Sequence, residues 1–128
     1  MAAYQKVKEK ASMKSEFISL KKNSDFSLVY KNGKPITNRL FVIIVRQSAE
    51  GSMNRVGISV SKKIGNSIVR HRLKRQIREC FRTHWNQWKS GYDIIVIARK
   101  GSNEHNYQDI SSSLLQLMKK HGLERGLE

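Results

Sequence analysis

Cations suited to contacts with a phosphate backbone gather in one stretch of the sequence. Residues 61–82 contain eight Lys or Arg residues and a single acid, Glu79. Arginine presents a planar fork of donors that matches a phosphate group. The segment from Ser61 to Asn66 leads into a helix N-terminus, whose free N–H groups can bind an anion. These residue types predict binding of a polyanion, and they favour RNA.

A helix beginning near Ser67 would sort these residues onto two faces. The apolar face contains Val69, Leu73, Ile77, Cys80 and His84. The opposite face and its flanks contain Arg70, His71, Arg72, Lys74, Arg75, Arg78 and Arg82. The simpler alternative is a solvated surface helix, in which acids would alternate with the cations. Glu79 is the only acid between Gly51 and Tyr92, which argues against that alternative.

The same stretch resembles the signature of the bacterial ribonuclease P protein family, S-K-K-x-G-N-A-V-x-R-N-R-x-K-R-x-x-R. The matching residues run from Ser61 to Arg78, and the chain departs from the signature at Ser67, Ile68 and His71. The departure at His71 changes a polar side chain on the face expected to meet RNA. The wider resemblance extends from about Leu20 to Leu117.

The resemblance implies a protein subunit that assists a catalytic RNA in removing the 5′ leader of precursor tRNA. The catalytic RNA and precursor tRNA would be the partners, with no obligate protein partner and no membrane. Magnesium ions at the scissile phosphate would be held mainly by the RNA, and the protein alone would bind no cofactor and be inactive. The residues expected to dock on the catalytic RNA are Lys62, Lys63, Asn66, Arg70, His71, Arg72, Lys74, Arg75 and Arg78.

A second expected site would hold the single-stranded leader. Phe26 and Tyr30 share one side of a short predicted helix, where such rings are normally core residues. The resemblance instead places them in a cleft, where they could stack on bases without reading sequence. Ser59 and Ser61 lie on the small-residue face of an alternating strand and could form the floor of that cleft.

The predicted fold is α+β, a two-layer sandwich with element order αβββαβα and a mostly antiparallel sheet. Asn23 or Ser24 would cap the first helix and Gly33 would end it in the left-handed conformation. Gly51-Ser52 suits a hairpin turn, and Asn106 with Asp109 resembles a capping box at the last helix. The one parallel βαβ unit would be right-handed by general expectation. The family resemblance implies a left-handed crossover instead.

The composition is that of one small domain with a strong positive charge. The 128 residues carry a net charge of +15, so salt should weaken partner binding steeply. We expect a basic flexible arm over residues 1–15, one RNA-binding domain over 16–122 and a frayed tail over 123–128. The single cysteine, Cys80, excludes an internal disulfide. No apolar run approaches the length of a membrane span and no signal peptide is evident, which predicts a cytoplasmic protein.

Two other functions stay open on sequence grounds. A structural RNA-binding protein, such as a ribosomal protein, could use the same basic helix without any role in cleavage. A free-standing nuclease could use His71 or His84, although the four histidines show no carboxylate pairing or metal-ligand spacing.

Overall fold

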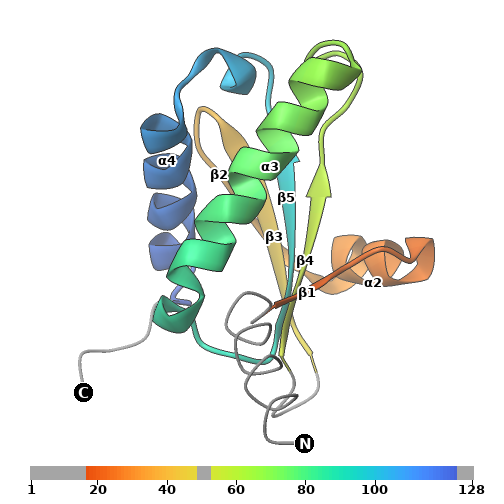
Figure 1. Ribbon diagram of the computed structural model, residues 1–128. Coiled ribbons are helices and arrows are strands. Elements are labelled where there is room, and N and C mark those ends of the chain that lie inside the picture. Colours follow the sequence, from red (N-terminus) through yellow and green to blue (C-terminus); the bar gives the residue numbers. More distant parts are fainter. Residues whose placement is uncertain (1–16, 49–52, 124–128) are drawn as a thin grey trace, which may run out of the picture.

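The computed structural model describes residues 17–48 and 53–123 (Figure 1). Five strands form one mixed sheet in the order β1-β4-β5-β3-β2. The strands are β1 (Phe17–Ser19), β2 (Lys34–Thr37), β3 (Phe41–Gln47), β4 (Asn54–Ser59) and β5 (Tyr92–Ala98). The helices are α2 (Asn23–Asn32), α3 (Ser67–His84) and α4 (Tyr107–Lys120), with short 3₁₀ turns η1 (Trp85–Gln87) and η2 (Ser102–Glu104). The predicted α+β class and the order αβββαβα are confirmed.

Alternating side chains of the central strands separate two hydrophobic clusters. Ile43 and Val45 of β3, with Ile94 and Val96 of β5, pack in the cluster that includes the buried residues of α3 and α4. The intervening residues Ile44 and Ile95 pack with Leu20 and Val29 on the other side. Two faces covered in this way explain why β3 and β5 are continuous apolar runs. The α3 and α4 helices therefore form one layer, and α2 alone lies on the second face.

The connection from β4 through α3 to β5 is left-handed. β4 pairs with β5 in parallel, with Val56 opposite Ile94 and Ile58 opposite Val96. Figure 1 shows both strands running upward, α3 in front of the sheet, and β5 to the left of β4. A right-handed crossover would place β5 to the right of β4 in this view. The crossover expected from the family resemblance is thus confirmed against the general rule.

Two details of strand pairing were not predicted. The short strand β1 pairs in parallel with β4, which adds an edge strand to the sheet. The strands on either side of the predicted Gly51-Ser52 hairpin, β3 and β4, do not pair with each other because β5 lies between them. The turn itself lies outside the described residues.

Three predicted boundaries also need correction. Gly33 ends α2 with φ −83°, so the left-handed stop was wrong. A Cβ at Gly33 would lie 2.5 Å from Ile44 Cγ2 and from the Val29 carbonyl oxygen, so close packing explains the glycine. Lys22 is the N-cap residue of α2, without a side-chain hydrogen bond, in place of the predicted Asn23 or Ser24. Leu123 is buried and donates its backbone N–H to Met118, so it belongs to the fold and not to the predicted tail.

Helix α4 begins at the predicted cap residue and ends as predicted, although the Asp109 carboxylate contacts His105 in place of the Asn106 N–H that a capping box requires. The Asn106 side chain accepts a hydrogen bond from the Asp109 N–H at 2.9 Å, which satisfies one free donor of the first turn. Ile110, Leu114 and Leu117 are fully buried, and Gly122 follows the helix with φ +84°. Among the described helices, none combines the length and apolar character needed to cross a membrane.

Candidate nucleic-acid interface

The start of α3 is fixed by its N-cap residue and by a buried anchor in the preceding loop. The Asn66 side chain accepts the Val69 N–H at 3.0 Å, so its carbonyl oxygen is committed to the helix. Ile64 is buried, while its neighbours Lys62 and Lys63 are exposed. A Cβ at Gly65 would lie 2.9 Å from Val69 Cγ1, so the loop passes close to the first turn. The loop thus holds two lysines beside the beginning of the helix.

The predicted apolar face of α3 is confirmed. Leu73, Ile77 and Cys80 are buried, and Phe81, which the sequence analysis did not include, is buried with them. Val69 and His84 are half-buried at the margins of this face. Because this face packs in the main core, the rotation of the helix about its axis is fixed, and so is the direction of the basic side chains.

The remaining surface of α3 presents cations that, apart from Arg82, have no acidic partner among the described residues. Among the described residues, no ion pair involves any cation predicted to bind RNA. His71, Arg72, Arg75 and Arg78 are exposed, whereas Arg70 and Lys74 are half-buried. The structure therefore brings the predicted RNA-binding residues together on one solvent-facing surface, which we call the basic face: Lys62, Lys63, Asn66, Arg70, His71, Arg72, Lys74, Arg75 and Arg78.

The basic face ends at an ion pair. Arg82 Nε donates to Glu79 Oε1 at 3.0 Å, one turn from the end of α3. The hydrogen bond from Arg82 lowers the pKa of the Glu79 carboxyl below its ordinary value, so the acid stays ionised and neutralises Arg82. Uncompensated positive charge is therefore concentrated in the first three turns of the helix.

An exposed apolar side chain lies within this surface and was missed by the sequence analysis. Ile68 is 77% exposed in the first turn of α3. Its spacing of four and seven residues from Arg72 and Arg75 places all three on one helical stripe, so helical periodicity could have identified it.

On the opposite face of the sheet, Phe26 of α2 lies against the backbone of β4. A Cβ at Gly57 would be only 2.6 Å from Phe26 Cζ, so the missing side chain is what lets the ring approach the strand. Phe26 is half-buried, Tyr30 is 48% exposed, and their ring centroids are 6.3 Å apart. Both rings therefore have surface available for stacking, while Val29 between them is fully buried.

The two serines predicted to form the cleft floor lie further along the same chain segment. Ser59 is half-buried and points to the same side of β4 as Gly57, and Ser61 is exposed beyond the end of the strand. A cavity of about 360 Å³ lies elsewhere, between Arg39, Leu40 and one side of α4. The leader cleft therefore stays a prediction.

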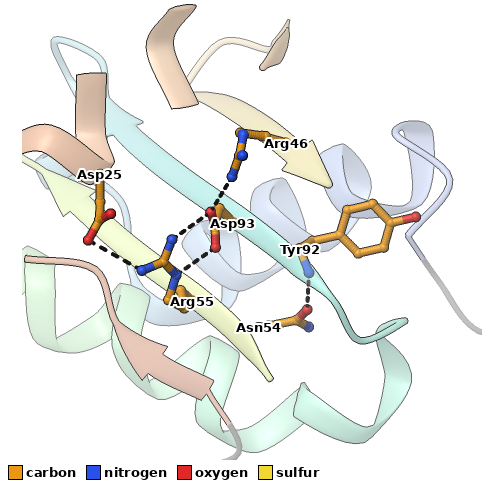
Figure 2. A network of polar contacts seen from close by, with 6 residues as sticks. All are labelled: Asp25, Arg46, Asn54, Arg55, Tyr92 and Asp93. Carbon is orange, nitrogen blue, oxygen red and sulfur yellow. Dashed lines mark hydrogen bonds and ion pairs between the residues drawn. The ribbon is translucent and has the colours of Figure 1, made fainter. Parts of the chain in front are cut away.

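A row of charged side chains crosses the sheet beneath α2 (Figure 2). Asp93 of β5 is completely buried and accepts hydrogen bonds from Arg46 of β3 at 3.0 Å and from Arg55 of β4 at 2.8 Å. Arg55 also reaches Asp25 of α2 at 3.3 Å. The hydrogen bond to Asp93 raises the pKa of Arg55 above its ordinary value. The sequence of β5 predicted only an apolar strand, so this network was not predicted.

His71 and His84, the two histidines considered for a free-standing nuclease, have no carboxylate partner among the described residues, whereas His105 pairs with Asp109 at 3.2 Å, which the sequence did not predict. The His84 ring nitrogen lies 2.8 Å from the Cys80 carbonyl oxygen, as expected for a core histidine with a backbone partner. His71 is exposed on the basic face. The part of the chain that the structure describes contains no group of three or more His, Cys, Asp or Glu residues that could hold a metal ion.

Cys80 is expected to react slowly with thiol reagents in the folded protein. Burial raises the pKa of its thiol, so the reactive thiolate is scarce at pH 8. Because the unfolded chain releases this proton more easily, the thiol contributes a loss of stability as pH rises above its ordinary pKa of about 8.5. The alkylation rate of Cys80, followed by mass spectrometry with and without denaturant, tests whether the folded protein reacts slowly. Equal rates in both conditions would contradict the buried position.

Comparison with known proteins gives one consistent family. The family model for ribonuclease P matches residues 15–122. The ribonuclease P protein component of Lachnoclostridium phytofermentans is 52% identical over 103 residues, covering 80% of this chain and 88% of the relative. That of Clostridium kluyveri is 47% identical over 106 residues, covering 81% and 94%.

Solved structures agree with the sequence relatives. The ribonuclease P protein of Staphylococcus aureus has a TM-score of 0.78 at 39% identity, covering 84% of this chain and 97% of that one. The protein from Thermotoga maritima has a TM-score of 0.74 at 35% identity, covering 80% and 96%. The arrangement of helices and strands described above is therefore shared with these proteins.

Proposed function

We propose that this chain, which belongs to the ribonuclease P protein family, is the RNA-binding subunit of a ribonucleoprotein that removes the 5′ leader of precursor tRNA. The observation that carries the proposal is the basic face, whose cations have no acidic partner among the described residues. A folded RNA supplies phosphates at fixed positions, which a rigid helix can meet with fixed guanidinium groups. The catalytic RNA is the proposed partner of this face.

The single-stranded leader would be bound on the other face of the sheet, beside α2. Phe26 and Tyr30 would stack on its bases, and Ser59 and Ser61 would border its path along β4. A single-stranded nucleic acid is bound well by aromatic rings combined with nearby cations. Lys62 and Lys63 directly follow Ser61 in the chain, so the basic face begins beside the proposed path of the leader.

Cleavage itself is assigned to the RNA partner. The described residues offer no group that fits a metal ion, so no step of the proposal runs through a protein-bound ion. Magnesium ions at the scissile phosphate would be held mainly by the RNA.

Reconstitution with a bacterial ribonuclease P RNA tests the proposal. The protein should raise leader removal from precursor tRNA at moderate magnesium concentration, and the protein alone should cleave nothing. Cleavage by the protein without added RNA would establish a nuclease instead. Tight RNA binding with no effect on leader removal would favour a structural RNA-binding protein.

Phe26→Ala is expected to weaken binding of precursor tRNA by about 1–3 kcal/mol, the usual range for one stacked base. Mature tRNA, which has no leader, should bind almost unchanged. Both affinities are measured with the reconstituted particle, and melting temperature is measured beside them.

Leu28→Ala is the matched control for this experiment, because Leu28 is 42% exposed on another side of α2. It should leave both affinities unchanged. If Phe26→Ala instead lowers the melting temperature strongly and weakens the binding of both tRNAs equally, the ring is a core residue and not a leader contact.

A further inference from the structure

We infer that Arg55 is a positioning residue that holds α2, and with it the ring of Phe26, in place over β4 by bridging Asp93 and Asp25. This role rests on the proposed leader cleft, since its consequence is a change in leader binding. The contacts of Arg55 are with protein groups, so it would act through Phe26 and not by touching the leader.

The bridge starts from a fixed point in the sheet. Arg46 and Arg55 lie directly opposite Asp93 on the two neighbouring strands, so the three residues form one cross-strand row. Asp93 is completely buried, and both of its carboxylate oxygens accept from Arg55, at 2.8 Å each. This two-point contact fixes the plane of the guanidinium group.

One nitrogen of the Arg55 guanidinium group stays available for a contact with α2. Nε and Nη2 of Arg55 are used by Asp93, and Nη1 points to Asp25 Oδ2 at 3.3 Å (Figure 2). A lysine has a single nitrogen and could not present the same fork to Asp93 while reaching Asp25. Arg55 is therefore suited to join the two carboxylates.

Helix α2 has few other polar ties to the sheet. Its N-cap residue makes no side-chain hydrogen bond. Within the described ranges, Asp25–Arg55 is the only ion pair between α2 and a strand. Asp25 immediately precedes Phe26, and Arg55 is two residues before Gly57, on which the ring lies. The ion pair and the ring contact thus join the same two segments, side by side.

If Asp25 affected binding only through its charge, its substitution would have a different effect from the loss of a positioning contact, so the two roles can be distinguished by experiment. Removing the negative charge of Asp25 would raise attraction for any polyanion, so precursor and mature tRNA should both bind more tightly. Loss of the positioning contact should instead weaken only the binding that depends on the leader.

The experiment measures Kd for precursor and mature tRNA with the particle reconstituted from the full chain. Asp25→Asn and Arg55→Lys should each reduce the preference for precursor tRNA by about two- to fivefold, the range expected for a half-exposed ion pair. Because both substitutions break the same link, the double variant should lose no more preference than either single variant.

Glu104→Gln is the matched control. It makes the same change in charge as Asp25→Asn, at an exposed residue of η2, well separated from α2 in Figure 1. It should leave the preference unchanged.

Two results would overturn the role of Arg55: a preference that is unchanged or increased in Asp25→Asn, or an equal loss of affinity for both tRNAs. If the preference depends on Phe26 but not on Asp25, the positioning role fails while the leader cleft stands. If the wild-type protein shows no preference for precursor tRNA, the cleft fails and the positioning role fails with it.

Discussion

Asp93→Asn is expected to lower the free energy of unfolding by about 3 kcal/mol, at the lower end of the range for breaking a buried ion pair. The carboxylate is completely buried and is the shared acceptor of Arg46 and Arg55. An amide of the same shape removes the negative charge and turns an N–H₂ group toward one of the guanidinium groups. The two arginine side chains are 28% and 32% exposed, so water partly compensates them.

Urea unfolding followed by circular dichroism measures this change. Asp25→Asn is the matched control, since it alters an acid of the same network whose side chain is 28% exposed. It should lower the free energy of unfolding by about 0.2–1 kcal/mol, the usual contribution of an ion pair near the surface. Equal and small effects of the two substitutions would show that the buried carboxylate contributes little to stability.

Replacing Arg72 and Arg75 together with Ala should weaken binding of the catalytic RNA by about ten- to a hundredfold at low salt. Both side chains are exposed on the basic face, so the fold and the melting temperature should be unaffected. If each arginine contacts one phosphate, the slope of log K against log salt should fall by roughly 1.4–1.8 in total. Filter binding across a series of salt concentrations measures both quantities.

Arg82→Ala provides the control on the same helix. Arg82 is paired with Glu79, so its loss removes one unit of charge but no proposed phosphate contact, and the salt slope should change far less than after the loss of Arg72 or Arg75. An unchanged salt slope in the double variant, or the same effect from Arg82→Ala, would contradict the proposed contact surface.

The helices and their faces could be predicted from the sequence because their signals are local. The spacing of Leu73, Ile77 and Cys80 defines the buried side of α3, and the basic face follows from what remains. The cap at Asn106 depends on a residue only three positions away. Helical geometry converts such short spacings directly into positions in space.

The arrangement of the sheet could not be predicted in the same way. Pairing of β5 between β3 and β4 depends on partners far apart in the chain, and the left-handed crossover contradicts the general rule. The left-handed crossover was predicted only from the resemblance to the ribonuclease P protein family. Asp93 was missed because a single acid next to a run of apolar residues gives no sign of its partners, Arg46 and Arg55, which lie on other strands.

The position of β5 has a consequence for how the protein is made on the ribosome. Strands β3 and β4 are synthesised before β5, yet in the finished sheet they do not pair with each other. Each of them has one edge without its pairing partner, β5, until residues 92–98 have left the exit tunnel. The central strand of the five, β5, is the last strand to be translated, so the sheet cannot be completed from the N-terminus onward. Assembly of the core must therefore wait until most of the chain has been synthesised.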